Sequence, residues 1–393
     1  MIQEDLSIRS GSRRFICEAT PRLEGLGHRV KIFTSKMNKK TCFEEFLHLP
    51  VEVVPVESPY ISRVLKPIMD IDYYWPRWQM AMETSKRVAD WRSDVVIFHY
   101  TGFEVWLPPY FYYLEKPVGA VCLHVPPWPT RRWDTWPWLP YASIETKIGR
   151  KIFALPPLSW WRAHSFEKLA MFISHSRFIQ EFAMKIQSKI RPLTAIVPLG
   201  VDHSEYYPTG EEEPYALCIS RFDPRKRLEL ALHAMKKTSS KHSLIIAGTL
   251  EERNIWYKNR LLDLADKLNI SERFKFVEGA THSQIVRLTQ KCSVFLFPST
   301  VDTFGVAVLE AMACGKPIIA SRAGSIPELL NGCGILIDPT HEQWQKPLRQ
   351  LLSDPPLREK LGKKAFQRSR LYSWDQTVHS LMNAIEKIVA RTK

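Results

Sequence analysis

Short apolar runs alternate along this chain with longer segments in which apolar residues recur at helical spacing. In the first half, the runs predict buried strands at 30–34, 52–56, 94–98, 119–123, 171–174 and 194–197. Helical spacing occurs between them at about 13–26, 70–91, 143–168 and 176–187, and Pro21 interrupts the first of these helices. Strands that alternate with helices are typical of parallel sheets covered by helices.

A polar segment at 203–215, HSEYYPTGEEEPY, contains three consecutive glutamates and indicates a domain boundary. Beyond it the alternation is clearer, with predicted strands at 216–219, 243–247, 274–277, 294–297, 317–320 and 334–337. Predicted helices lie at 226–237, 252–268, 281–290, 305–313, 325–331, 341–352, 357–371 and 375–390. We therefore expect an α/β protein with two Rossmann-like domains facing a cleft.

Length and composition agree with this architecture. A chain of 393 residues is long enough for two domains of roughly 200 residues each. The apolar fraction of 45% and the charged fraction of 24% are ordinary for a folded domain. The seven cysteines are scattered without a CxxC pair, which argues against a disulfide framework or a zinc site. With no apolar run of 18 residues and no signal-peptide pattern, we expect a cytoplasmic protein that does not cross a membrane.

The net charge of +14 indicates an anionic partner, either nucleic acid, a phosphorylated small molecule or an anionic bilayer. Ten of the thirteen tryptophans precede residue 162 and cluster with Pro, Lys and Arg at 75–80 and 126–140. Tryptophan beside basic residues suits the boundary between water and lipid, so we expect a peripheral contact with an anionic membrane and no nucleic-acid partner. The alternative is a proline-ordered loop packed on its own domain.

Candidate chemistry follows the predicted strand 294–297, because ligands of doubly wound domains bind at the carboxyl ends of strands. The loop after this strand carries Asp302, and a helix begins near Gly305. The amides around Thr303, Phe304, Gly305 and Val306 are placed to bind phosphate. Glu310 lies inside the helix, where its carboxylate can accept bonds from ribose hydroxyls, and Asp302 can do the same for a hexose. The alternative for Glu310 is a solvated helix face.

A second cluster, ISRFDPRKRLELALHAM at 219–235, follows the first strand of the second domain. Arg221 and Lys226 lie five residues apart across one strand-to-helix loop, so both can reach the same diphosphate. The neighbouring Arg225 and Arg227 are expected to face solvent.

These two clusters resemble the C-terminal domain of glycosyltransferase family 4, the retaining group 1 enzymes of the GT-B fold. The stretches PLGVDHSEYYP (198–208), VEGATHSQIVRL (277–288) and AGSIPELL (323–330) are similar too, and the likeness covers essentially residues 12–390. The family carries E-x7-E, which Asp302 and Glu310 match except that the first acid is one methylene shorter. The resemblance implies that Glu310 holds the nucleotide ribose, Asp302 the donor sugar, and Arg221 and Lys226 the donor diphosphate.

The resemblance also implies a domain order: an acceptor-binding domain at 1–205, a nucleotide-sugar domain at 206–372, and a C-terminal helix at 373–393 that returns to the first domain. In the first domain, family members place a glycine loop at the position of Gly11, in SGSRR, and a histidine facing donor and acceptor at the position of His124. His99, His164 and His175 are rivals for that role, although a lone histidine is more often structural. Asp70 and Asp72 imitate a metal motif but open a predicted helix, so we expect no metal and no cofactor.

Taken together, the sequence predicts a retaining glycosyltransferase. It would move a hexose from a nucleoside diphosphate sugar to a lipid-linked or envelope-glycan acceptor at the cytoplasmic face of a membrane. Two alternatives stay open. One is another GT-B enzyme, such as a nucleotide-sugar epimerase or a phosphorylase, and the other is a non-catalytic basic binding protein.

The start of the chain departs from the family pattern. A central strand buried on both faces reads as a near-continuous apolar run, whereas MIQEDLSIRS is mostly polar. The segment 5–9 is its best candidate strand, with Leu6 and Ile8 on one face. We therefore expect an incomplete first strand, and a first domain that either needs additional upstream residues or folds loosely.

Overall fold

A computed structural model describes residues 1–3, 5–7, 10–55, 82–100, 119–123, 170–186, 193–338 and 343–392. These residues fall into two compact units. The first contains the described residues up to Pro198 together with those from Asp375 onward, and the second contains Leu199–Trp374. The segment 199–212, which the sequence assigned largely to a linker, therefore groups with the second unit.

The first unit is built on parallel strands: β1 (Ile32–Thr34), β2 (Val51–Val53), β3 (Val96–Tyr100), β4 (Gly119–Leu123), β5 (Met171–Ser174) and β6 (Leu193–Ile196). β1 pairs with β2, and β3 to β6 pair in sequence order. Its helical elements are α1 (Gly11–Gly25), η1 (Glu44–Leu47), residues 82–90 and α7 (Arg177–Ile186). The strands, α1 and α7 match predicted elements within a few residues, whereas η1 was not indicated by the sequence. Of the predicted helix at 70–91 only the part from residue 82 onward is described, and the predicted helix at 143–168 lies outside the described residues.

The N-terminal segment fills the position between β1 and β3. Ile2 forms parallel bridges with Phe33 of β1 and Phe98 of β3. Its amide donates to the Ile97 carbonyl at 2.9 Å, and its own carbonyl accepts from the His99 amide at 2.9 Å. Ile2 is only 5% exposed.

Ile2 therefore occupies the central position for which the segment was considered too polar, although isolated bridges hold it there and not a regular strand. Of the candidate strand at 5–9, Asp5 forms an isolated bridge with Lys36, and residues 8 and 9 lie outside the described residues. Ile2 bonds to β3 through its own amide and carbonyl, whereas β1 is bonded through the Met1 carbonyl and the Gln3 amide. The buried Gln3, at 0% exposure, is the polar side chain that made the segment read as a loop.

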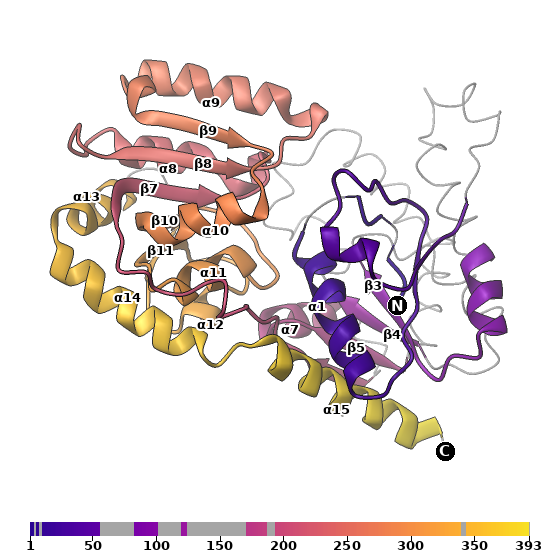
Figure 1. Ribbon diagram of the computed structural model, residues 1–393. Coiled ribbons are helices and arrows are strands. Elements are labelled where there is room, and N and C mark those ends of the chain that lie inside the picture. The colour runs from indigo at the N-terminus through magenta and orange to yellow at the C-terminus, as the bar shows by residue number, and fades with distance from the viewer. Residues whose placement is uncertain are drawn as a thin grey trace. The chain divides into compact units, whose positions relative to one another are not determined.

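The second unit has one parallel sheet in the order β12-β11-β10-β7-β8-β9 (Figure 1). Its strands are β7 (Glu213–Ile219), β8 (Ser243–Gly248), β9 (Phe274–Glu278), β10 (Cys292–Phe297), β11 (Ile318–Ser321) and β12 (Ile335–Ile337). The chain adds β8 and β9 on one side of β7 and then returns to add β10, β11 and β12 on the other. The strand order therefore reverses between β7 and β10.

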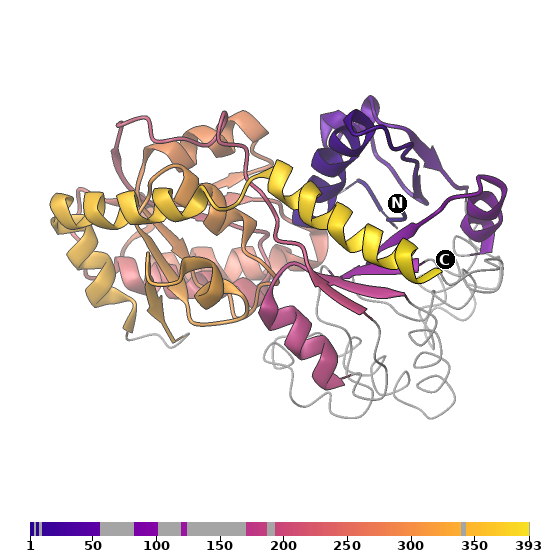
Figure 2. The ribbon, with the colours of Figure 1, turned by 90° about the horizontal axis from the view of Figure 1, so that it is seen from below.

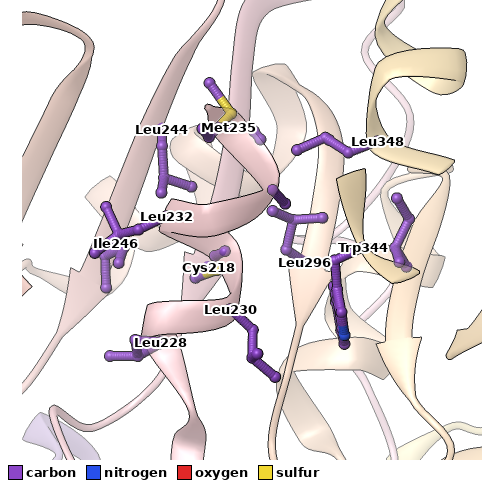
Figure 3. Close-up of a cluster of buried hydrophobic side chains, with 14 of the residues drawn as sticks. Cys218, Leu228, Leu230, Leu232, Met235, Leu244, Ile246, Leu296, Trp344 and Leu348 are labelled. Carbon is purple, nitrogen blue, oxygen red and sulfur yellow. The ribbon is translucent and has the colours of Figure 1, made fainter. Parts of the chain in front are cut away.

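Helices connect these strands: η5 (Pro224–Lys226), α8 (Leu228–Met235), η6 (Glu252–Asn254), α9 (Ile255–Lys267), η7 (Ser271–Arg273), α10 (His282–Lys291), α11 (Val306–Ala313) and α12 (Ile326–Leu330). Two further helices, α13 (Gln345–Ser353) and α14 (Pro355–Ser369), follow β12. Figure 3 shows how α8 packs between strand residues such as Leu244 and Leu296 and the side chains of Trp344 and Leu348. The apolar face of α8 is fully buried, which anchors the loop that precedes it.

The last helix, α15 (Trp374–Thr392), rejoins the first unit, as Figure 2 shows. Its buried residues Val378, Leu381 and Ile388 recur at helical spacing. Arg22 Nε contacts Asp375 at 2.8 Å, and Thr377 donates its hydroxyl to the Pro198 carbonyl at 2.8 Å. The predicted returning helix is therefore present. Within the described part of the chain, no helix is both long enough and apolar enough to span a bilayer.

Candidate active site

The sequence-predicted residues of the second unit meet where the strand order reverses. β7 and β10 are neighbours, and the loops that leave their carboxyl ends carry Arg221, Lys226 and Asp302. Thr300 ties the two loops together, because its amide and its hydroxyl donate to the Arg225 carbonyl at 3.0 and 2.9 Å. In open α/β sheets, such a switch point is the usual position of a ligand site.

Lys226 and Asp302 form an ion pair across the switch point. The distance from Lys226 Nζ to Asp302 Oδ2 is 2.9 Å, and the two side chains are 17% and 20% exposed. Lys226 also lies over the Phe297 ring, 5.3 Å from its centroid. Burial alone would raise the pKa of Asp302. The charge of Lys226 and the hydrogen bonds from Lys226 and from the Phe304 and Gly305 amides outweigh burial, and the pKa lies below its ordinary value.

The start of α11 is also organised by Asp302. Asp302 Oδ1 accepts a hydrogen bond from the Phe304 amide at 3.2 Å. The prediction that this amide is available to a phosphate is therefore wrong, and the available face of the helix begins closer to Val306. Gly305 caps the helix at φ +94°, a conformation that favours glycine, and a Cβ there would lie 2.6 Å from Ile326 Cδ1.

A third segment, residues 323–325 after β11, also supports the Asp302 loop. The sequence analysis did not assign it a role. The Ser325 amide and hydroxyl both donate to the Asp302 carbonyl at 3.1 Å. Gly324 has φ +60°, and a Cβ there would lie 2.7 Å from the Asp302 amide nitrogen. The sequence signal for this support was AGS (323–325), one residue after β11, because small residues are typical of a loop that passes close to another backbone.

The remaining predicted residues of this loop lie along the same path. Thr303 and Val306 are half-buried, and Glu310 is half-buried in the second turn of α11. Phe304 is 4% exposed, and its ring meets Tyr372 edge to face at 5.9 Å. The side chain of Phe304 therefore belongs to the core, and its amide is bonded to Asp302.

Arg225 and Arg227 do not face solvent as simple surface charges, contrary to the sequence expectation. Arg225 Nε lies 2.8 Å from Asp223 Oδ1, and Arg227 pairs with Glu229. Burial alone would raise the pKa of Asp223, but hydrogen bonds and charge from Arg225 dominate and lower it well below its usual range. Both arginines are paired because each has an acidic residue two positions away in the sequence, close enough for the side chains to meet.

Arg221 lies two residues beyond the end of β7, with a side chain that is 39% exposed. Its Nη1 lies 3.5 Å from Glu251 Oε1, at the outer limit of a hydrogen bond. Glu251 comes from the loop after β8, so the loops after β7, β8 and β10 all contribute to this edge of the sheet.

The first unit contributes one described candidate. Gly11 is the first residue of α1, where Arg13 donates to the hydroxyls of Ser10 and Ser12 at 3.1 Å each. His99 and His175 are both buried and both contact Phe15, at centroid distances of 5.4 and 5.6 Å, as expected of structural histidines. The predictions for His124, His164, Asp70, Asp72 and the tryptophan-rich segments lie outside the described residues. Among the described residues, no cluster of metal-ligating side chains occurs.

Comparison with solved structures shows the fold class. Sucrose-phosphate synthase from Thermosynechococcus elongatus superposes with a TM-score of 0.77 at 18% identity, covering 97% of this chain and 94% of that one. The UDP-glucose complex of Anabaena HepE superposes with a TM-score of 0.73 at 16% identity, covering 98% of both chains. The protein therefore has the GT-B fold.

Comparison with protein families identifies the second unit. Residues 203–368 match the family model of glycosyl transferases group 1. A probable sucrose-phosphate synthase from Thermosipho melanesiensis is 27% identical over 228 residues, which are 54% of this chain. The match covers 51% of that relative, so the chain spans about half its length. Every candidate residue from Arg221 to Glu310 lies inside the family match.

Proposed function

We propose that the protein is a retaining glycosyltransferase that moves a hexose from a nucleoside diphosphate sugar to a lipid-linked or envelope-glycan acceptor. The observation that carries the proposal is the position of Arg221, Lys226, Asp302 and Glu310. All four lie on the loops and helix that leave β7 and β10 at the point where the strand order reverses. A site with two cations beside a helix N-terminus suits a diphosphate and its sugar.

Each residue has a role in this proposal. Arg221 and Lys226 bind the diphosphate and, with the N-terminus of α11, stabilise the charge that develops as it leaves. Glu310 accepts hydrogen bonds from the ribose hydroxyls. Asp302 already accepts bonds from Lys226 and from the Phe304 amide, so a sugar hydroxyl would use its remaining acceptor capacity.

The acceptor step is proposed from the resemblance to retaining enzymes. The acceptor hydroxyl attacks the anomeric carbon on the face from which the diphosphate departs, and the leaving phosphate oxygen takes the acceptor proton. Gly11 and His124 would belong to the first domain's side of this reaction. Solved complexes of Anabaena HepE with UDP and with UDP-glucose support a nucleotide sugar as the donor class. We propose that no metal or other cofactor takes part, because cations of the chain can neutralise the diphosphate.

A thermal-shift screen with UDP, GDP, ADP and their sugars tests the donor assignment. We expect one base to raise the melting temperature above the other two, and its labelled sugar to be turned over with retained anomeric configuration. Stabilisation by none of the three would argue against the donor site. Inverted product would remove the retaining mechanism while leaving the donor site intact.

We further propose a peripheral position at the cytoplasmic face of a membrane, supported by the net charge of +14 and the tryptophan-rich sequence at 126–140. The protein should cosediment with anionic liposomes at low ionic strength and be released as salt is added. Charge reversal at Arg131 and Arg132, combined with Trp133→Ser and Trp136→Ser, should abolish cosedimentation. If wild-type protein does not cosediment either, the segment is a structural loop.

A further inference from the structure

The loop after β7 is electrically balanced, although the chain as a whole carries a charge of +14. Every basic side chain between residues 221 and 227 forms an ion pair with a carboxylate. The pairs are Arg221–Glu251, Arg225–Asp223, Lys226–Asp302 and Arg227–Glu229. An anionic ligand that binds at this loop therefore has to compete with these carboxylates for the cations.

Two of these pairs are fixed in place. Asp223 is 8% exposed and receives Arg225 Nε at 2.8 Å on one oxygen and 3.1 Å on the other. Glu229 holds Arg227 and also accepts a hydrogen bond from the Tyr257 hydroxyl at 2.7 Å. A ligand that took either arginine would leave an enclosed carboxylate without its cation, which is costly.

The two remaining pairs differ in strength. Lys226 and Asp302 are 17% and 20% exposed, and their closest atoms are 2.9 Å apart. Arg221 and Glu251 are 39% and 28% exposed, and their closest atoms are 3.5 Å apart. Of the four pairs, Arg221–Glu251 is thus the most solvated and has the longest contact, so Arg221 is the cation that a ligand can recruit most easily.

We infer that Glu251 is an internal competitor for Arg221: its carboxylate holds the guanidinium when the site is empty and opposes binding of the nucleoside diphosphate. This inference rests on the proposed function, because it assigns Arg221 to the diphosphate. Glu251 acts through Arg221 and is a positioning residue. Its charge weakens nucleotide affinity and so speeds release of the nucleoside diphosphate product.

The expected change in nucleotide affinity is opposite in direction to that of most substitutions at a binding site. Removing Glu251's charge should strengthen binding, because the diphosphate no longer has to displace a carboxylate from Arg221. The pair is partly exposed, so the gain is modest, roughly three- to fivefold in affinity at low salt and smaller at high salt. A merely structural role for Glu251 predicts the opposite, a loss of affinity.

Calorimetric titration of the full chain tests the inference, with the nucleoside diphosphate that the wild type binds most tightly among UDP, GDP and ADP. Glu251→Gln keeps the shape of the side chain and should lower Kd about three- to fivefold. Glu252→Gln removes the same charge from the exposed neighbouring residue and should leave Kd unchanged. In an Arg221→Ala background, Glu251→Gln should bring a smaller gain than in the wild type, because the contact that the diphosphate displaces is absent and only the repulsion between Glu251 and the ligand remains.

The outcomes separate this inference from the proposed function. Unchanged or weaker binding by Glu251→Gln, with Arg221→Ala also weakened, overturns the competitor role and leaves the donor site standing. An equal gain from Glu252→Gln overturns it as well, because the effect would then be general charge repulsion. If the wild type binds none of the three nucleoside diphosphates, the proposed function fails and the inference falls with it.

Discussion

At the scale of single residues, the site is built from side chains that do more than one task. Asp302 pairs with Lys226, closes the turn before α11 through the Phe304 amide, and is held by Ser325 through its carbonyl. An aspartate suits this position because its short side chain can bond to an amide two residues ahead. The acid that the sequence marked as a sugar contact is therefore also the junction of three loops.

The ionised state of Asp302 should appear in the pH dependence of stability. Its folded-state pKa lies below its unfolded value of about 3.9, so its contribution is complete above that pH and is lost as the pH falls. Asp302→Asn should lower the free energy of unfolding by roughly 1–3 kcal/mol at pH 7. Urea unfolding at several pH values should show the difference from wild type shrinking below about pH 4.

Asp338→Asn is the matched control for this series, because Asp338 is 62% exposed and lies 3.7 Å from Arg322. It should change the free energy of unfolding little at any pH. A wild-type advantage over Asp302→Asn that stayed constant from pH 7 to pH 3 would contradict the ion pair.

The proposed donor roles predict kinetic effects at single residues. Arg221→Ala removes a diphosphate contact, and Glu310→Gln weakens a ribose contact. Each should cost at least tenfold in kcat/KM, about 1.4 kcal/mol of transition-state stabilisation. Arg322→Ala, which removes an arginine that is 59% exposed, is the control and should have wild-type kinetics. Wild-type kinetics in both site variants would refute the donor assignment.

At the scale of elements, the support that Gly324 gives to the Asp302 loop can be tested by comparing alanine substitutions at Gly324 and at Gly332. Gly324 and Gly332 both have positive φ, +60° and +86°, so alanine strains the backbone at either position by about 1 kcal/mol. At Gly332 a Cβ would meet nothing within 4 Å, whereas at Gly324 it would collide with the Asp302 backbone. Gly324→Ala should therefore cost at least about 2 kcal/mol more in unfolding free energy than Gly332→Ala.

Nucleotide binding is the second readout of the same pair of variants. Gly324→Ala should weaken it, because the Asp302 loop must move, while Gly332→Ala should not. Equal stability and equal binding in the two variants would show that the AGS segment does not support the site.

The elements were predictable from sequence because a parallel strand buried on both faces reads as an apolar run, as in β10, where every residue is buried. The contacts between loops were not, because they join residues far apart in the chain, such as Lys226 with Asp302 and Thr300 with Arg225. The pairing of Ile2 escaped prediction for another reason. So short a segment shows no periodicity of apolar residues, and its Gln3 is buried although glutamine is a polar residue that is usually exposed.

At the scale of the whole molecule, a reversal of strand order occurs in both units. In the second, the order reverses between β7 and β10, and in the first the N-terminal segment separates β1 from β3. Reversal of strand order places loops from both directions at one edge of the sheet, and in the second unit the candidate residues lie there.

The N-terminal segment should carry measurable stability in the first unit. Ile2 is 5% exposed, so Ile2→Ala should lower the free energy of unfolding by about 2–4 kcal/mol. Leu26→Ala, at a residue that is 61% exposed, is the control and should be close to neutral. Denaturant unfolding followed by a probe in the first unit measures both. A neutral Ile2→Ala would mean that the segment is not packed between β1 and β3.

The central claim is that the carboxyl ends of β7 and β10 form a nucleoside diphosphate site. Hydrogen exchange of the full chain, with and without saturating UDP, GDP or ADP, tests it most directly. With the nucleotide that binds, we predict slower exchange in the loop 220–227 and in the segment 302–310, and little change in η7 and the start of β9, residues 271–276. Slowed exchange confined to other parts of the chain, or no binding of any of the three nucleotides, would contradict the account.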